Sequence, residues 1–557
     1  MSEPSYGGLQ QISVKAGNLA ADGNPARAAA LYMKLGKSLY KQEQWAEAAE
    51  CFRQALALKP ASAVAHYQLG RTLLAQNQLT DALTSFRQAV TLKPNYFKPL
   101  CGLGAAFHSL GQLAEASRSF QAAIALRPNY KCILDAKLWY NLGGILLEAA
   151  QAAEGVKALQ QAIALKPDFA EAYMHLGNGL LLLHKPNEAV ATLQQAIDLK
   201  PDLAGAYNNL GNALQSQGKA GEAIAAYDHA ISLSPTDPDL YTNRAQVILL
   251  SGDLARGFAE YEWRTKPGRL HHFYEWFDDK PRWRGENFSG KRLLVYDEQG
   301  CGDTLQFCRY LPLVKTRGGI VQFSAKQPLL RLLADCPGID ELVEHSPAAI
   351  ARTESDLAVP LLSLPYIFGT TLPTIPSDVP YLTIDQHCIA AWRDRMKCPG
   401  SNLRVGLVWA GNPANMAGQI RTCGLPAMSP LAGIPGVTFY SLQKGEAAKQ
   451  ANTLPPNMQL IDLTDDIEDF ADTAALIMNL DLVISIDTAV AHLAGALGKP
   501  VWTLLPAAGE WRWLLARSDT PWYPTMRLFR QSSPGDWSSV MTAVAQELRT
   551  LSTSTAK

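Results

Sequence analysis

The sequence lacks long apolar runs and clustered charge, and these absences exclude several classes of protein. In 557 residues, no apolar stretch approaches the ~20 residues that a helix needs to cross a bilayer. The formal net charge is −1 and no run of five lysines or arginines occurs, which disfavours nucleic acid and acidic membranes as partners. The first residues contain neither the basic segment nor the apolar core of a signal peptide. We therefore expect a cytoplasmic protein with no membrane span.

Cysteine pairs are also missing. The nine cysteines are scattered, and none forms a Cys-x-x-Cys pair or a Cys/His metal spacing. The sequence thus supports neither a disulfide framework nor a zinc site. Its hydrophobic content of 47% and charged content of 18% are ordinary for a soluble globular protein. A chain of this length is expected to form several domains rather than a single core.

What is present is a repeat. Prolines at positions 60, 94, 128, 167, 201 and 235 are 34, 34, 39, 34 and 34 residues apart. A Leu-Gly pair recurs with the same period, from Leu35-Gly36 to Leu210-Gly211, and small residues recur at fixed distances after it. Small residues let two helices approach closely, and the proline cannot continue the second helix. Such a period predicts an array of stacked helix pairs.

The period and its signature residues resemble the tetratricopeptide repeat over residues 27–269, as about seven repeats after a tail formed by residues 1–26. The seventh unit, Thr236 to Arg269, has Arg244-Ala245 in place of the Leu-Gly pair. This is the change expected of a terminal repeat that faces another part of the protein.

One position, directly before each Leu-Gly pair, lines the inner surface in related arrays. In O-GlcNAc transferases, which this chain resembles more distantly in layout, asparagines there grip the backbone of an extended peptide. The resemblance therefore implies a groove for a protein or peptide acceptor at Asn141, Asn209 and Asn243, since an amide side chain can pair with a peptide group. The alternative is that they are solvated polar residues on an exposed helical face. The position reads Lys34, Gln68, Gly102, Asn141, His175, Asn209 and Asn243.

Residues 270–290 form an aromatic linker punctuated by proline, which includes Tyr274, Trp276 and Trp283. This composition differs from that of a flexible Gly/Ser tether. We expect the linker to pack the repeats rigidly against the next domain, although its aromatic residues could instead contact an acceptor.

Short apolar runs followed by glycine turns and helical patterns predict that the second half is α/β. Residues 292–296, 404–409, 437–442, 482–486 and 499–505 are expected as strands of parallel sheets. After the first strand, glycines that include Gly302 would let a ligand approach backbone amides at a helix N-terminus. Two Rossmann-like lobes, residues 291–385 and 386–557, imply a ligand cleft at the carboxyl ends of their strands.

Two segments carry a more specific resemblance. Arg292 to Pro312, with Gly302-Asp303 after the strand, is similar to the N-terminal signature of the heptosyltransferases of glycosyltransferase family 9. Val483 to Pro506, with Asp487, Thr488 and His492, resembles their C-terminal signature. The chain is therefore similar to bacterial tetratricopeptide-repeat proteins with a heptosyltransferase-like domain. The resemblance implies an α-helical solenoid of tetratricopeptide repeats (TPRs), followed by an α/β GT-B fold with two Rossmann-like lobes.

The resemblance also implies roles for single residues. Asp303 would be the general base that takes the proton from the acceptor hydroxyl, although aspartate at this place also serves as a helix N-cap. Asp487, Thr488 and Ala489 would hold the sugar and diphosphate of the donor. The helix that they open would stabilise the departing phosphate, so no metal or other cofactor is expected. His492 would orient the phosphate or pack between helix and sheet.

Three further residues belong to the implied donor site. Lys444 would contact phosphate, Glu446 would contact the ribose hydroxyls, and Arg421 would be a cationic phosphate ligand; the alternative for Lys444 and Glu446 is a solvated loop. The chain departs from its relatives in the loop 414–422. Asn415 and Gly418 stand where they usually carry a histidine and an acidic residue.

From these features we expect an inverting, metal-independent glycosyltransferase. It would move a sugar from a nucleotide-sugar donor to a Ser/Thr hydroxyl of a protein held by the repeats. The altered loop leaves a second hypothesis open, a catalytically silent repeat scaffold that retains the fold for protein interaction. A third is a transferase acting on a glycolipid, although the repeats favour a protein partner.

Overall fold

The computed structural model describes residues 6–127, 132–277, 279–396, 402–413, 416–507 and 509–555. The chain divides into two compact units, residues 1–209 and 210–557. Among the described helices, none combines the length and the apolar composition needed to cross a bilayer.

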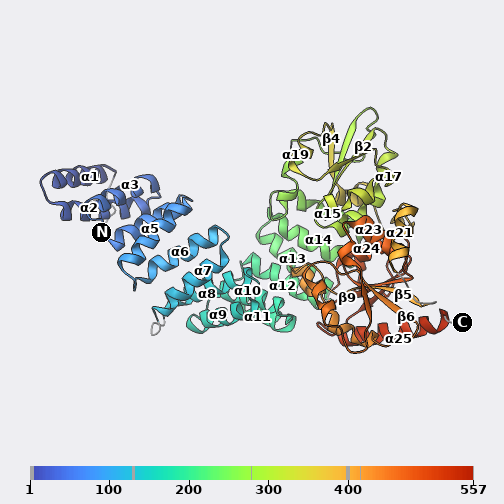
Figure 1. The fold of residues 1–557 in the computed structure, drawn as a ribbon. Helices are drawn as coiled ribbons and strands as arrows, with labels where there is room; N and C mark the ends of the chain where they lie inside the picture. The colour runs from blue at the N-terminus through green and yellow to red at the C-terminus, as the bar shows by residue number, and fades with distance from the viewer. Residues whose placement is uncertain are drawn as a thin grey trace. The chain divides into compact units, whose positions relative to one another are not determined.

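In the first unit, helix pairs are stacked one after another, and the second unit begins with further helix pairs (Figure 1). This confirms the TPR solenoid. A helix α1, Tyr6–Ala21, occupies much of the segment expected as a tail and packs on α2. The helices of the repeats are α2 (Pro25–Lys41), α3 (Trp45–Leu58), α4 (Ala63–Ala75), α5 (Leu79–Leu92), α6 (Phe97–Ser109), α7 (Leu113–Ala125), α8 (Ile133–Glu148), α9 (Ala152–Leu165), α10 (Ala170–Leu182), α11 (Pro186–Leu199), α12 (Ala204–Ser216), α13 (Ala220–Leu233), α14 (Pro238–Leu250) and α15 (Leu254–Tyr261).

The glycine of each Leu-Gly pair leaves room for a large side chain from the second helix of the same repeat. A Cβ on Gly70 would lie 2.7 Å from the ring of Phe86, and a Cβ on Gly211 would lie 2.6 Å from the ring of Tyr227. Phe86 and Tyr227 are fully buried. The recurring glycine is therefore required by close packing of the two helices.

The last repeat shares its core with the α/β part of the second unit. Leu249 and Leu250 of α14 and Phe258 of α15 belong to the same buried apolar cluster as the strands of both lobes. The ring of Phe258 meets that of Trp511 edge to face, with centroids 5.6 Å apart. In the aromatic linker, Trp283 is fully buried. This repeat therefore packs as part of the second unit.

A buried ion pair also joins the last repeat to the turn after the first strand of the α/β part. Arg264 donates to both carboxylate oxygens of Glu298, from Nη2 at 2.9 Å and from Nε at 3.0 Å. Glu298 also accepts from the backbone N–H of Leu362 at 2.9 Å and from the hydroxyl of Tyr274. Both charged side chains are fully inaccessible to solvent.

The α/β part contains two parallel sheets, which confirms the GT-B architecture of two Rossmann-like lobes. The N-terminal sheet has the order β3-β2-β1-β4, and the C-terminal sheet has the order β10-β9-β8-β5-β6-β7. The strands are β1 (Arg292–Tyr296), β2 (Ile320–Ala325), β3 (Glu341–Glu344), β4 (Leu357–Pro360), β5 (Leu403–Val408), β6 (Val437–Ser441), β7 (Leu460–Asp462), β8 (Leu482–Ile486), β9 (Val501–Leu505) and β10 (Met526–Arg530).

In each sheet the strand order reverses next to the first strand of the lobe. β1 lies between β2 and β4, and β5 lies between β6 and β8. Ligands of open parallel sheets bind outside the carboxyl ends of the strands at such reversals. Helices α16 (Cys301–Phe307) and α24 (Ala489–Ala496) follow β1 and β8 and contact each other.

Candidate functional site

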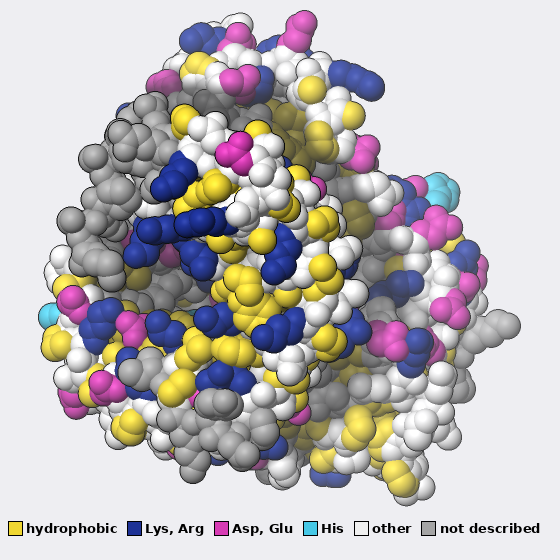
Figure 2. All heavy atoms as spheres, turned by 90° about the vertical axis from the view of Figure 1, so that its left-hand side faces the viewer, with side chains coloured by type: hydrophobic (Ala, Val, Ile, Leu, Met, Phe, Trp, Pro, Cys, Tyr) yellow, Lys and Arg dark blue, Asp and Glu magenta, His cyan; other side chains and the backbone are white. Residues whose placement is uncertain are grey.

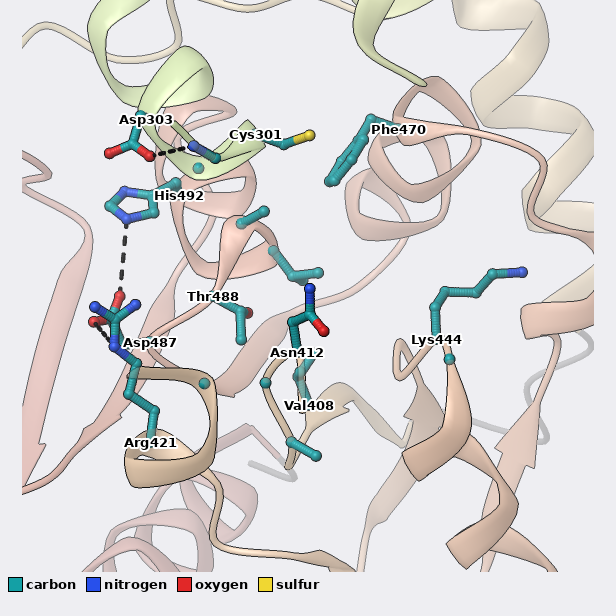
Figure 3. Close-up of a pocket in the computed structure, with 18 of the residues that line it drawn as sticks. Cys301, Asp303, Val408, Asn412, Arg421, Lys444, Phe470, Asp487, Thr488 and His492 are labelled. Carbon is teal, nitrogen blue, oxygen red and sulfur yellow. Dashed lines mark hydrogen bonds and ion pairs between the residues drawn. The ribbon is translucent and has the colours of Figure 1, made fainter. Parts of the chain in front are cut away.

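A cleft of about 900 Å³ opens where α16 and α24 meet. Its walls come from the loops after β1, β5 and β8, from α22 (Met416–Arg421) and from the start of α23 (Phe470–Met478) (Figure 3). The last repeat contributes Gln246 and Tyr261 to the same wall. All nine residues expected at the catalytic and donor sites line this cleft: Gly302, Asp303, Arg421, Lys444, Glu446, Asp487, Thr488, Ala489 and His492.

Asp303 lies in the first turn of α16, with one carboxylate oxygen engaged in the local structure. Its Oδ2 accepts from the backbone N–H of Gly300 at 2.8 Å, which is the reciprocal half of a capping box. Its Oδ1 accepts from Nη2 of Arg512, which belongs to the other lobe. Asp303 therefore caps its helix from the third helical position, with Gly300 as the N-cap, and it also lines the cleft.

Arg512 is a site residue that the sequence did not single out. Its Nε donates to Gln306 Oε1 at 2.6 Å and its Nη1 pairs with the carboxylate of Glu510. Burial lowers the pKa of Arg512, but the carboxylates of Glu510 and Asp303 outweigh it, so the pKa is raised and the guanidinium stays charged. Burial raises the pKa of Glu510 despite the opposing charge of Arg512.

Asp487 directly follows β8 at the base of the cleft and is only 3% exposed. Its Oδ2 lies 3.2 Å from Nε of Arg421, a contact without hydrogen-bond geometry that acts as an ion pair. Thr488 follows as the N-cap of α24, but its hydroxyl lies 3.1 Å from Ser485 Oγ and does not cap the helix. Thr488, Ala489 and Val490 line the cleft, so the helix N-terminus opens towards it.

His492 is buried in the second turn of α24. Burial lowers its pKa to about 3, which keeps the imidazole neutral near pH 7. Its Nδ1 lies 2.9 Å from the hydroxyl of Tyr523, and its Nε2 lies 3.9 Å from Asp487 Oδ1 (Figure 3). The ring also stacks near Trp513, with centroids 5.2 Å apart. The histidine thus packs against Tyr523 and Trp513, which lie between β9 and β10, and it also lines the cleft.

Gly302 allows the two lobes to approach each other. A Cβ at this position would lie 3.1 Å from Cδ2 of His492 and 3.5 Å from Cα of Ala489. The glycine therefore brings the backbone of α16 close to the N-terminus of α24.

Lys444 and Glu446 lie on the rim of the cleft with protein partners of their own. Lys444 Nζ donates to the carbonyl oxygens of Thr464 at 2.6 Å and Ile467 at 3.0 Å. Glu446 is 72% exposed at its side chain and pairs with Lys449 at 2.9 Å. Lys444 therefore braces the neighbouring loop, and Glu446 lies on a solvated surface.

Gly418 of α22, one of the two loop positions noted in the sequence, packs closely against the residues after β5. A Cβ on Gly418 would lie 2.1 Å from the carbonyl oxygen of Asn412. The backbone N–H of Gly411 donates to Thr422 Oγ1 at 3.0 Å. This close packing leaves no room for a side chain at position 418. Asn415, also noted in this loop, lies outside the described residues.

The asparagines of the expected acceptor groove lie on the first helices of their repeats. Asn141 on α8 is exposed, and Asn209 on α12 is partly exposed and accepts from Asn208 Nδ2 at 3.3 Å. Asn243 lies on α14 of the other unit, one helical turn before Gln246. Gln246 lies on this face of α14 and lines the cleft. No motif in the sequence predicted it as a site residue.

Comparison with known proteins agrees with both halves. Tetratricopeptide-repeat profiles match residues 33–97, 98–130, 136–169, 185–218 and 211–252. The profile of glycosyltransferase family 9 (heptosyltransferase) matches residues 443–520. The chain thus carries tetratricopeptide repeats followed by a family 9 glycosyltransferase domain. The matched segment includes Asp487 and Arg512 but neither Asp303 nor Arg421.

Protein FlbA of Caulobacter vibrioides is 28% identical over 331 residues, which cover 53% of this chain and 52% of FlbA. The chain therefore spans about half the length of this curated relative. A solved structure of YrrB, described as a TPR protein with an unusual peptide-binding site, is 24% identical, covers 34% of this chain and 94% of YrrB, and gives a TM-score of 0.30. A tetratricopeptide repeat protein from Parabacteroides merdae is 14% identical, covers 44% of this chain and 96% of its own, and gives a TM-score of 0.39.

Proposed function

We propose that this protein transfers a sugar from a nucleotide-sugar donor to a Ser/Thr hydroxyl of a protein acceptor. The observation that carries the proposal is the meeting of Asp303 and the N-terminus of α24 in one cleft, from opposite lobes. The family 9 match covers α24 and supports a transferase. A carboxylate and a helix N-terminus are the two groups that a sugar transfer needs, as proton acceptor and as support for the leaving phosphate.

In the proposed mechanism the acceptor oxygen attacks the anomeric carbon while the bond from that carbon to the diphosphate breaks. Asp303 takes the proton of the acceptor hydroxyl. The backbone N–H groups at the start of α24 and the guanidinium of Arg421 stabilise the negative charge on the departing diphosphate. A single displacement on the face opposite the leaving group inverts the anomeric configuration. The chain's own positive groups carry the charge, so the proposal requires no metal.

Arg512 acts on this reaction through Asp303. The guanidinium is fixed by Glu510 and Gln306 and holds Asp303 Oδ1 from the other lobe. Arg512 is therefore a positioning residue, which fixes the orientation of the base when the two lobes are together. Gln246 and Tyr261 of the last repeat line the cleft, so a protein acceptor would pass along this side of the cleft to reach the base.

A thermal-shift screen tests donor binding on the full chain. Sugar diphosphates of uridine, guanosine, adenosine and thymidine are compared at millimolar concentration with the matching nucleoside diphosphates. A donor present at about 100 times its Kd stabilises the native state by about 2.7 kcal/mol and raises the melting temperature. The donor that raises it is then used in a transfer assay with a Ser/Thr-containing acceptor protein. No shift with any donor would contradict the proposal.

A catalytically silent scaffold is the second candidate, and one observation favours it. Both oxygens of Asp303 have protein partners, and Arg421 is paired with Asp487. A donor that raises the melting temperature but gives neither transfer nor hydrolysis over many hours would support this candidate.

A further inference from the structure

In the first three repeats, the first helix of each pair carries positive charge without any negative charge. Residues 27–127 contain twelve lysines and arginines and five acidic residues, a surplus of seven positive charges in a chain whose net charge is −1. The first helices of these repeats, α2, α4 and α6, contain no aspartate or glutamate. The acidic residues all lie on the turn after α2 or on the second helices: Glu43, Glu47, Glu50, Asp81 and Glu115.

Five cations on these first helices form a set that we call the basic face: Lys34, Lys37, Lys41, Arg71 and Lys98. The three on α2 follow a spacing of three and four residues, so they share one side of the helix. The side chain of Arg71 connects α2 to α4, because its Cζ lies 4.5 Å from the ring centroid of Tyr40 and 5.7 Å from that of Tyr67. Viewed from the side of the N-terminal repeats, lysine and arginine side chains gather among hydrophobic ones (Figure 2).

The charge of the basic face is not neutralised within the described residues. None of its five cations forms an ion pair there, and Arg71 donates instead to the neutral Gln68 at 3.1 Å. On the second helices, by contrast, Arg53 lies 3.6 Å from Glu50 and Arg118 lies 2.8 Å from Glu115. Unpaired like charges on neighbouring helices repel one another, and an acidic partner would relieve this repulsion.

Aromatic rings lie between these cations. The ring of Tyr67 meets that of Tyr96 edge to face, with centroids 5.4 Å apart, and Tyr40, Tyr67 and Tyr96 are all partly exposed. Tyrosines offer apolar contact and a hydroxyl to an extended peptide at low entropic cost.

We propose that the basic face binds an extended acidic segment of a partner protein. A peptide fits better than a nucleic acid because the positive charge stops after three repeats. The positive surplus ends there: α8 carries Asp135 and Glu148 with one lysine, and α10 carries Glu171 with no lysine or arginine, so a continuing phosphate backbone would meet no further surplus of positive charge. That the partner is the acceptor rests on the proposed function; the binding itself does not.

The test measures binding to the full chain in the absence of any donor. The probe is a fluorescein-labelled peptide of twelve residues with five glutamates and aspartates, and its control carries glutamine and asparagine at those places. Fluorescence anisotropy is expected to detect the acidic peptide alone. Its Kd is expected to rise about tenfold between 50 and 300 mM NaCl, because salt screens exposed charges.

Two matched double variants locate the site. Lys34→Glu with Lys37→Glu should raise the Kd about tenfold or more, since two attractive contacts become repulsive. Arg53→Glu with Lys59→Glu makes the same change in net charge outside the first helices. This variant should change the Kd of the acidic peptide less than about threefold. Circular dichroism at 222 nm checks that each variant is folded, and Lys34→Gln with Lys37→Gln should fall between wild type and the reversal.

An equal rise of the Kd in the two double variants would overturn the proposal, because it would show that the net charge of the protein alone attracts the acidic peptide. Tighter, Lys34-dependent binding of an oligothymidine of similar length would also overturn it in favour of a nucleic acid. Because no donor is present, failure here leaves the proposed transfer untouched, and a failed donor screen leaves this binding site untouched.

Discussion

Arg512 Nη2 donates to Asp303 Oδ1 across the cleft, and this contact joins the two lobes at the residue proposed as base. The two residues are separated by 209 positions in the sequence, and the arginine has its own support from Glu510 and Gln306. The residue proposed as base is therefore oriented by the lobe that also carries the expected donor site. Such an arrangement would couple the closed state of the cleft to the position of the proton acceptor.

Asp303→Asn should abolish sugar transfer while leaving donor binding intact. The amide keeps the size of the side chain and can still accept from Gly300 N–H, but it cannot take a proton. Loss of a general base lowers the rate by roughly 10²–10⁴-fold. Transfer is measured by the mass increase of the acceptor protein, and donor binding by thermal shift.

Asp519→Asn is the matched control, because Asp519 lies outside the cleft and pairs with Arg517 on the surface. It should leave transfer unchanged. An Asp303→Asn variant with undiminished transfer would remove Asp303 from the role of base.

Gly302→Ala should weaken both donor binding and transfer. The added Cβ would press on His492 and on the first turn of α24, so α16 and α24 would move apart. Displacements on the order of 1 Å in an active site cost about 10²-fold in rate. Gly221→Ala on α13 is the control, because a Cβ there meets nothing within 4 Å. If the two variants bind donor and transfer sugar equally well, the close approach at Gly302 is not needed for function.

The repeats and several strands could be predicted because their signals are local. The 34-residue period and the Leu-Gly pairs depend on contacts within one repeat, and the apolar run 482–486 coincides with β8. The fold class followed from these patterns and from the resemblance. β2, β3, β4, β7 and β10 were not predicted individually, since none is followed by the glycine turn that marks β1.

The site could be predicted only in part. Asp487 directly follows β8, and Asp303 lies in the first turn of the helix after β1; both positions are at the carboxyl ends of parallel strands, which indicates a ligand site. Arg512 reaches the cleft from a distant loop, and Gln246 reaches it from a repeat helix. Both depend on tertiary contacts, so no motif or spacing in the sequence predicts them. Lys444 was expected to face phosphate, but its partners are two backbone carbonyls that only the folded loop brings near.

Glu298→Gln should destabilise the second unit strongly. The substitution leaves the guanidinium of Arg264 buried, and among the described residues its remaining ion pair is with Glu262, which is partly exposed. Breaking a fully buried ion pair in this way costs about 3–5 kcal/mol. Urea denaturation followed by tryptophan fluorescence measures the free energy of unfolding.

The exposed pair of Arg517 and Asp519 gives the contrast for this measurement. Removing Asp519 should change stability by less than about 1 kcal/mol, because solvent screens an exposed pair. An equally small effect of Glu298→Gln would mean that Arg264 finds compensation elsewhere and that the pair does not anchor the last repeat.

His492→Asn should flatten the dependence of stability on acid pH. Burial holds the pKa of His492 at about 3 in the native state, below the value of about 6.5 expected for an unfolded chain. As pH falls below about 6.5 the unfolded state binds a proton that the native state does not, so stability is lost through this window down to about pH 3. At pH 5 the loss is on the order of 2 kcal/mol relative to neutral pH.

Asparagine places a polar atom near the hydroxyl of Tyr523 but does not titrate, so the variant should lose this part of the slope. Urea denaturation at half-unit intervals from pH 4.5 to 7.5 gives the slope for each protein. His387→Asn changes an exposed histidine on the surface and should leave the slope of the wild type in place. Identical slopes for wild type and His492→Asn would show that the imidazole gains a proton in the folded protein. In that case His492 would be a cation facing Asp487 and the expected diphosphate site, and its role would be electrostatic rather than packing.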